Sequence, residues 1–131
     1  MIIRRQHRGT GGGAREPGAA TGQLRLSRRA GADGSQVVSV AGELDIATAE
    51  QAYAYLTDLI DQGHTPLSVD LADLTFCDAS GLSVLAKSAK RAREAGRQLM
   101  LTHARPSLLR IMHVTELDTM FPELSSPAAT G

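Results

Sequence analysis

The feature that most constrains the fold is a strand-to-helix transition in the middle of the chain, around Ser80. Residues 67–71 alternate apolar and polar side chains, as a half-buried β-strand does. Beyond it, apolar and small side chains recur at helical spacing, which predicts a helix from near Ser80 to about residue 94, stopped by Gly96. Ser80 is therefore expected in the turn between strand and helix, at or beside the helix N-cap.

Composition narrows the classes of protein that this chain can be. Its 131 residues, 42% of them hydrophobic, suit one domain with a core of its own. Aromatic residues make up only 3% and Trp is absent, which argues against a stacking surface for single-stranded nucleic acid. The single cysteine, Cys77, excludes an internal disulfide and a cysteine-based metal cluster.

Hydropathy and charge predict a soluble, cytoplasmic protein with no membrane or direct nucleic-acid partner. No apolar run approaches the roughly 20 residues of a membrane span, and the N-terminal arginines are not followed by the apolar stretch of a secretory signal. The formal net charge is +0, but residues 1–35 hold seven arginines against two acidic residues. A basic arm of this kind can touch an acidic partner, and a solvated tail is the favoured interpretation.

Three segments are expected along the chain. Residues 1–22 are rich in Gly and Arg and predict a flexible leader, residues 23–124 the folded domain, and residues 125–131 a flexible tail. The glycines of the leader are not a phosphate-binding loop, because no Gly-Lys-Ser/Thr follows them.

Within the folded segment, strands alternate with helices. Strands are predicted near residues 24–27 and 37–41, as an antiparallel hairpin, and at 67–71, 99–101 and 117–121. Helices are predicted at 49–60, at 80–94 and from Pro106 onward, the first opened by a capping box of Thr48 and Gln51. This alternation implies a small α/β domain with a mixed sheet of four or five strands and helices packed on it.

Ser80 admits several interpretations from its position alone. It can cap the helix through its side-chain oxygen, or present an exposed hydroxyl to another protein. A hydrolase nucleophile is disfavoured, because Asp78 and Leu82 stand where the Gly-x-Ser-x-Gly elbow needs glycines, and the histidines are scattered. No His-x-x-x-His spacing supports a metal. We therefore expect no catalytic residue, metal or cofactor.

Two motifs together resemble one known family. Asp78-Ala79-Ser80-Gly81-Leu82 between strand and helix, and Gly42-Glu43-Leu44-Asp45 followed by Thr48-Ala49 upstream, resemble the signature of STAS-domain anti-sigma-factor antagonists of bacteria, over roughly residues 23–124. The resemblance implies that Ser80 is phosphorylated by a partner that is both anti-sigma factor and serine kinase, and is reset by a serine phosphatase. Unmodified protein would bind this partner and release the sigma factor, in control of stress response or sporulation.

The resemblance also implies a partner-binding surface. Its expected residues are Asp45, Asp78, Ala79, Ser80, Gly81 and Leu82. A phosphate brings roughly −1.5 to −2 charges, and its burial at an interface beside the carboxylates of Asp78 and Asp45 would oppose binding. Asp45 has a plainer alternative explanation, since acidic residues favour the positive end of a helix.

Three further expectations concern the C-terminus, the alternative function and the oligomeric state. The family usually continues into a further C-terminal helix, which the short, breaker-rich residues 125–131 do not predict. A STAS-like scaffold without phosphorylation, or an accessory subunit of a lipid-transport complex, is the alternative function. The chain is expected to be a monomer or a weak dimer.

Overall fold

The computed structural model describes residues 20–21, 23–64 and 66–121. The predicted tail 125–131 and most of the predicted leader 1–22 lie outside these residues. The described elements, in chain order, are strands β1 (Ala20–Thr21), β2 (Leu24–Ala30) and β3 (Gln36–Leu44), helix α1 (Ala49–Asp61), strands β4 (Leu67–Asp70) and β5 (Leu74–Cys77), helix α2 (Ala79–Glu94), strand β6 (Leu99–Thr102), helix α3 (Pro106–Val114) and the 3₁₀ helix η1 (Leu117–Met120).

The strands form one mixed sheet, which confirms the predicted α/β fold class. Its order is β1-β2-β3-β4-β6, with β5 paired to β3. β2 and β3 form the predicted antiparallel hairpin, in which Leu26 lies opposite Val40. β4 is parallel to β3 and to β6. Parallel neighbours end at the same edge of the sheet, so the turns that follow β3 and β5 lie close together.

β3 changes partner partway along its length, and this change positions the turn that contains Ser80. Its first half pairs with β4 and its second half with β5, with an irregularity in register between Gly42 and Glu43. Gly42 has φ +98, and a Cβ there would collide with the carbonyl oxygen of Gln23. Glycine is therefore the residue that fits the bend. Beyond it, Leu44 pairs with Cys77 at the end of β5.

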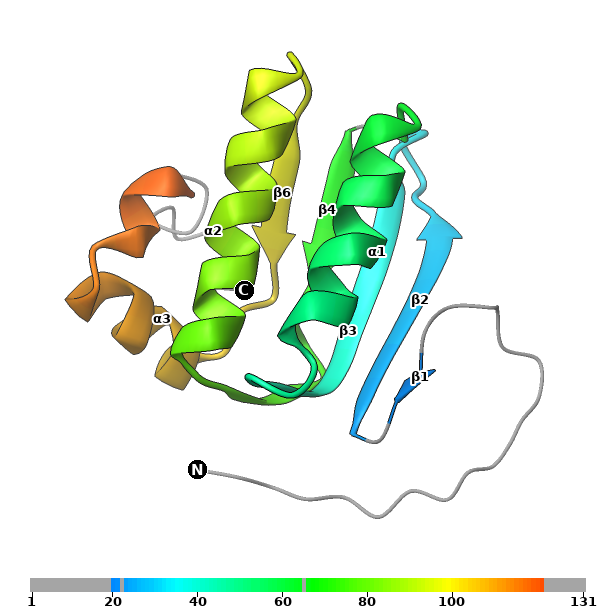
Figure 1. Cartoon of the computed structure of the whole chain (residues 1–131). Coiled ribbons are helices and arrows are strands. Elements are labelled where there is room, and N and C mark those ends of the chain that lie inside the picture. The colour runs from blue at the N-terminus through cyan, green and yellow to red at the C-terminus, as the bar shows by residue number, and fades with distance from the viewer. Residues whose placement is uncertain (1–19, 22, 65, 122–131) are drawn as a thin grey trace.

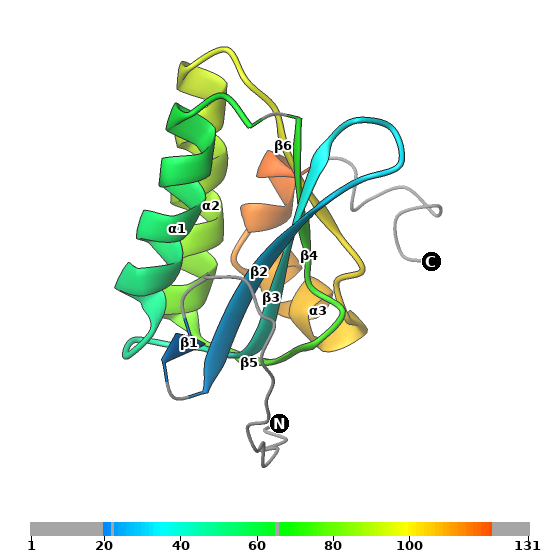
Figure 2. The same cartoon turned by 90° about the vertical axis from the view of Figure 1, so that its right-hand side faces the viewer.

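Helices α1 and α2 lie side by side over one face of the sheet (Figures 1 and 2). Alternation along the strands sends apolar side chains toward these helices, while Ser27 and other polar residues point the other way. The core between sheet and helices holds strand residues Leu24, Leu26, Val38, Val40, Leu67, Val69 and Leu101, and helix residues Leu56, Ile60, Leu82 and Leu85.

The segment after α3 differs from its prediction. Residues 117–121, expected as a strand, begin with the 3₁₀ helix η1, and only Phe121 follows it. Glu116 has φ +63, which turns the chain. Leu117 and Met120, three residues apart, then both pack against the core, as 3₁₀ spacing allows. η1 and α3 lie beyond α2, at the β6 edge of the sheet (Figure 1).

Among the described residues, no helix combines the length and the apolar character that a membrane crossing requires.

Candidate functional site

Ser80 is the second residue of α2 and lies where β5 turns into the helix. Its side chain is partly exposed, and its hydroxyl makes no hydrogen bond within the part of the chain that the structure describes. The turn sits beside the end of β3, because the backbone N–H of Asp78 donates to the carbonyl oxygen of Leu44 at 3.3 Å. The Ser80 hydroxyl is therefore without a hydrogen bond among the described residues, on a turn that follows β5 and is bonded to the end of β3.

Asp78, and not Ser80, caps the helix. Its Oδ1 accepts hydrogen bonds from the backbone N–H groups of Ser80, at 2.9 Å, and Gly81, at 3.1 Å. The interpretation of Ser80 as the cap is wrong, because the residue two positions earlier already satisfies the first amides of α2. Asp78 thus holds the turn through hydrogen bonds to local amides.

Gly81 and Leu82 face the interior. Leu82 is 4% exposed and belongs to the core. A Cβ on Gly81 would collide with the carbonyl oxygen of Leu44 and lie 2.7 Å from the Sγ of Cys77. The glycine therefore lets α2 pack closely on the end of β3, and this internal contact accounts for it without a partner. Ala79, by contrast, is exposed beside Ser80.

Asp45 lies in the turn between β3 and α1, next to the turn that contains Ser80. It directly follows Leu44, and Asp78 directly follows Cys77, the residue paired with Leu44. Its Oδ1 accepts from the backbone N–H groups of Ala47, at 3.0 Å, and Thr48, at 3.2 Å. The two carboxylates therefore occupy neighbouring strand ends, and each is held by backbone amides.

The predicted capping box at Thr48 does not form. Thr48 precedes α1 as its N-cap residue, but its side chain makes no capping hydrogen bond. Its hydroxyl instead donates to the carbonyl oxygen of Glu43, at 3.0 Å, and accepts from the backbone N–H of Asp45, also at 3.0 Å. Thr48 and Asp45 thus bind each other's backbone and fix the turn, so the hydroxyl is not available to the helix.

A groove runs between the N-terminal halves of α1 and α2, and Ser80 lies in it. The groove has a volume of about 620 Å³. We call it the α1–α2 groove; its lining residues are Ile46, Ala49, Glu50, Tyr53, Ala79, Ser80, Ser83, Val84 and Lys87. The ammonium of Lys87 lies 4.7 Å from the centroid of the Tyr53 ring. The sequence interpretation did not name Ile46, Tyr53 or Lys87 as site residues.

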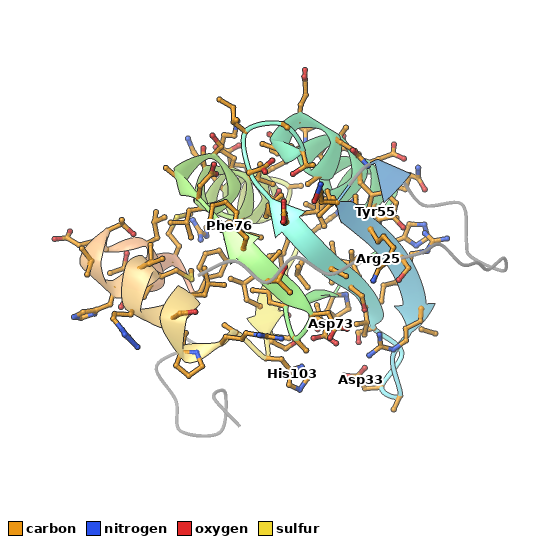
Figure 3. All side chains as sticks on the ribbon, turned by 90° about the horizontal axis from the view of Figure 1, so that it is seen from below. Arg25, Asp33, Tyr55, Asp73, Phe76 and His103 are labelled. Carbon is orange, nitrogen blue, oxygen red and sulfur yellow. The ribbon has the colours of Figure 1, made fainter. Side chains whose placement is uncertain are left out.

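Cys77 is a partly buried thiol that packs against the core. Burial, and secondarily the charge of Asp78, raises the pKa of Cys77 to about 12. It lines a small pocket of about 140 Å³ between β5 and α3, together with Phe76. Figure 3, seen toward the ends of the parallel strands, shows where Phe76 lies on β5.

None of the described histidines is hydrogen-bonded to Ser80, and His64 follows the C-terminal end of α1, whereas Ser80 lies at the N-terminal end of α2. Nδ1 of His103 lies 3.2 Å from a carboxylate oxygen of Asp70, and Nδ1 of His113 lies 3.0 Å from a carboxylate oxygen of Asp118. Figure 3 shows His103 on the side of the sheet away from α1 and α2. Among the described residues, therefore, no hydrogen bond joins Ser80 to a histidine that could serve as its base.

Comparison with known proteins agrees with this geometry. The family model described as "Mlab, STAS domain" matches residues 27–124. The "Anti-sigma-B factor antagonist" of Bacillus subtilis is 31% identical over 80 residues, which cover 61% of this chain and 72% of the relative. "Putative anti-sigma factor antagonist BtrV" of Bordetella bronchiseptica is 28% identical over 99 residues, covering 76% of this chain and 85% of the relative.

A solved structure shares the fold. The Bacillus cell fate determinant SpoIIAA in its phosphorylated form superposes with a TM-score of 0.59 at 19% identity, over 74% of this chain and 88% of that one. The family match spans most of the chain and includes both the turn that contains Ser80 and the turn that contains Asp45. The chain belongs to the STAS domain family, and the two curated relatives described above are named anti-sigma factor antagonists.

Proposed function

We propose that this protein is an anti-sigma-factor antagonist, itself not an enzyme, that is switched by phosphorylation of Ser80. The unmodified form binds an anti-sigma factor with serine kinase activity and releases the sigma factor; the phosphorylated form does not bind, and a serine phosphatase restores it. The observation that carries the proposal is the partly exposed Ser80 hydroxyl, which is unpaired within the described residues because Asp78 already caps the helix.

The geometry of the turn suits a phosphoacceptor. Such a residue needs an accessible hydroxyl in a fixed place, since the kinase supplies the base, the metal and the nucleotide. Asp78 fixes the backbone through hydrogen bonds to the amides of Ser80 and Gly81, and Gly81 itself packs closely against Leu44. The backbone thus holds the Ser80 hydroxyl in place, while the hydroxyl itself makes no hydrogen bond within the described residues.

The same geometry explains why a phosphate would release the partner. The backbone amides of Ser80 and Gly81 are bonded to Asp78, so a phosphate on Ser80 adds its charge beside a carboxylate, with that of Asp45 on the next strand end. At an interface these charges would have to lose water together. Each loss of about 1.4 kcal/mol weakens binding tenfold, so a penalty of a few kcal/mol is enough.

The test measures binding and modification together. Each histidine-kinase-like ATPase anti-sigma factor of the native host is purified and titrated with wild type, Ser80→Ala and Ser80→Asp. We expect wild type and Ser80→Ala to bind one of them and Ser80→Asp to bind it at least about 100-fold more weakly. With Mg-ATP, peptide mass mapping should find one phosphate on Ser80.

Ser27→Asp is the matched control, because Ser27 is exposed on β2 and faces away from the helices. It should bind like wild type. Equal affinities of Ser80→Ala and Ser80→Asp would overturn the switch.

A second candidate function is considered because the description of the matching family model includes the name Mlab. In this alternative the chain is a STAS scaffold, or an accessory subunit of a lipid-transport complex, and Ser80 is not phosphorylated. An unmodified Ser80 under every growth condition, together with co-purification of a transporter ATPase, would favour it.

A further inference from the structure

The most exposed large apolar side chain among the described residues lies beside the candidate phosphorylation site. Ile46 is 79% exposed, in the turn between β3 and α1, directly after Asp45. The turn is fixed by the hydrogen bonds that Asp45 and Thr48 make to each other's backbone. An isoleucine exposed to water does not stabilise the fold. On a binding surface, however, a side chain on a rigid turn loses little conformational entropy when a partner covers it.

Ile46 lies on the same groove as Ser80. Both residues line the α1–α2 groove, with the short side chains of Ala49 and Ala79, which leave room for close approach. A surface that covers Ile46 would thus also cover the Ser80 hydroxyl.

The opposite end of the groove is polar and carries a cation. Lys87 lies two helical turns after Ser80 and rests over the ring of Tyr53. No carboxylate of the described residues forms an ion pair with Lys87. The groove therefore runs from an apolar residue to a cation, with the carboxylate of Glu50 also in its lining, and among the described residues no ion pair joins Glu50 to Lys87.

We propose that the α1–α2 groove is the surface by which this chain binds its anti-sigma factor. Ile46 is the apolar anchor, which enters an apolar pocket of the partner, and Lys87 meets a carboxylate of the partner. The inference rests on the proposed function and names the contact residues of that site. The continuity of the groove with Ser80 supports this role, as does the combination of an apolar end with a cationic end.

The experiment compares two exposed apolar residues of similar exposure. Val114, on α3, is 74% exposed and does not line the groove. The anti-sigma factor that binds wild type is titrated with Ile46→Ser, Val114→Ser and Lys87→Glu. We expect Ile46→Ser to bind about tenfold or more weakly, as loss of a buried anchor does, and Val114→Ser to bind like wild type. Lys87→Glu should bind more weakly, and added salt should weaken its binding less than that of wild type, because salt screens the new repulsion.

Separate readouts keep each outcome decisive. Urea unfolding should show the same stability for Ile46→Ser and Val114→Ser, because neither side chain is buried. Wild-type affinity of Ile46→Ser beside a non-binding Ser80→Asp would overturn this inference and leave the proposed function standing. Absence of binding by wild type to every such partner would overturn both. If Ile46→Ser instead abolished self-association in sedimentation and left partner binding unchanged, the groove would belong to a second copy and the inference would be wrong.

Discussion

At the residue scale, the side chain that organises the site is Asp78, whose oxygen holds the amides of Ser80 and Gly81. Asp78→Ala should lower the free energy of unfolding by about 1 kcal/mol, as loss of an N-cap does. Asp78→Asn keeps a cap oxygen and removes only the charge, so it should lose a few tenths of that amount. Urea unfolding of the two variants checks the difference. Equal losses would show that the charge of Asp78, and not its hydrogen bonds, stabilises the turn.

A second prediction at this scale concerns Cys77, whose pKa is raised to about 12 from its ordinary value of 9.0. At pH 8 the native thiol should react with iodoacetamide at least about tenfold more slowly than the thiol of the urea-unfolded chain, because the thiolate is the reactive form. The folded thiol stays protonated where the unfolded one ionises, so its contribution to stability should fall as pH rises from about 9 to 12. Cys77→Ala should lack this alkaline loss. Fast alkylation of the native protein would show that the thiol is accessible and not held protonated by burial.

At the scale of elements, the change of partner along β3 is what places its end beside the turn that contains Ser80. Gly42→Ala should destabilise the domain by more than about 3 kcal/mol or prevent folding. The new Cβ would collide with the backbone of Gln23, and the alanine would also have to adopt φ +98. Gly34→Ala is the matched control, because Gly34 has φ +89 and no atom within 4 Å of the added Cβ. It should lose only the 1–2 kcal/mol or so of backbone strain. Similar losses for both variants would show that strain alone matters at Gly42.

The same elements show how far the sequence predicts the fold. Helices and hairpin follow from periodicity, and glycine and proline mark where helices end or begin, so α1, α2 and the start of α3 match their predictions. The errors occur where two local solutions compete. Thr48 has the residue type of a cap, but its hydroxyl binds the preceding turn. A short apolar run such as 117–121 does not distinguish a strand from a 3₁₀ turn.

The candidate site was predictable only in part, because motifs identify some of its residues and tertiary packing determines the others. Motifs identify Ser80, Asp78 and Asp45, which the parallel pairing of β3 and β5 places at neighbouring strand ends. The place of Ile46 in the candidate site depends on its exposed fraction, and the place of Lys87 depends on the neighbouring helix, whose Tyr53 it contacts. Local sequence spacing encodes neither of these. An isoleucine between Asp45 and Ala47, in a turn that is otherwise polar or small, was the available signal.

At the scale of the whole molecule, the site and the core are separate layers. Ser80, Ala79 and Ile46 reach solvent at the starts of α2 and α1, whereas Gly81 and Leu82 already belong to the interior. The amides nearest to Ser80 are occupied by Asp78, so an added phosphate has no new backbone bonds to form there. The switch proposed at Ser80 would therefore change what the surface can bind and leave the sheet as it is.

Hydrogen exchange on the full chain tests this separation. Phosphorylation of Ser80 should leave the amide protection of peptides from β3, β4 and β6 unchanged, because their hydrogen bonds and buried side chains lie away from the modified turn. Changes should be confined to the turns around residues 45–48 and 78–83, while binding of the anti-sigma factor by unmodified protein should protect residues 45–53 and 79–87. Phosphorylated Asp78→Asn should show the smaller change at its turn, since the repelling carboxylate is gone. Loss of protection across the sheet on phosphorylation would mean that the phosphate acts by loosening the fold, and the account of a surface switch would be wrong.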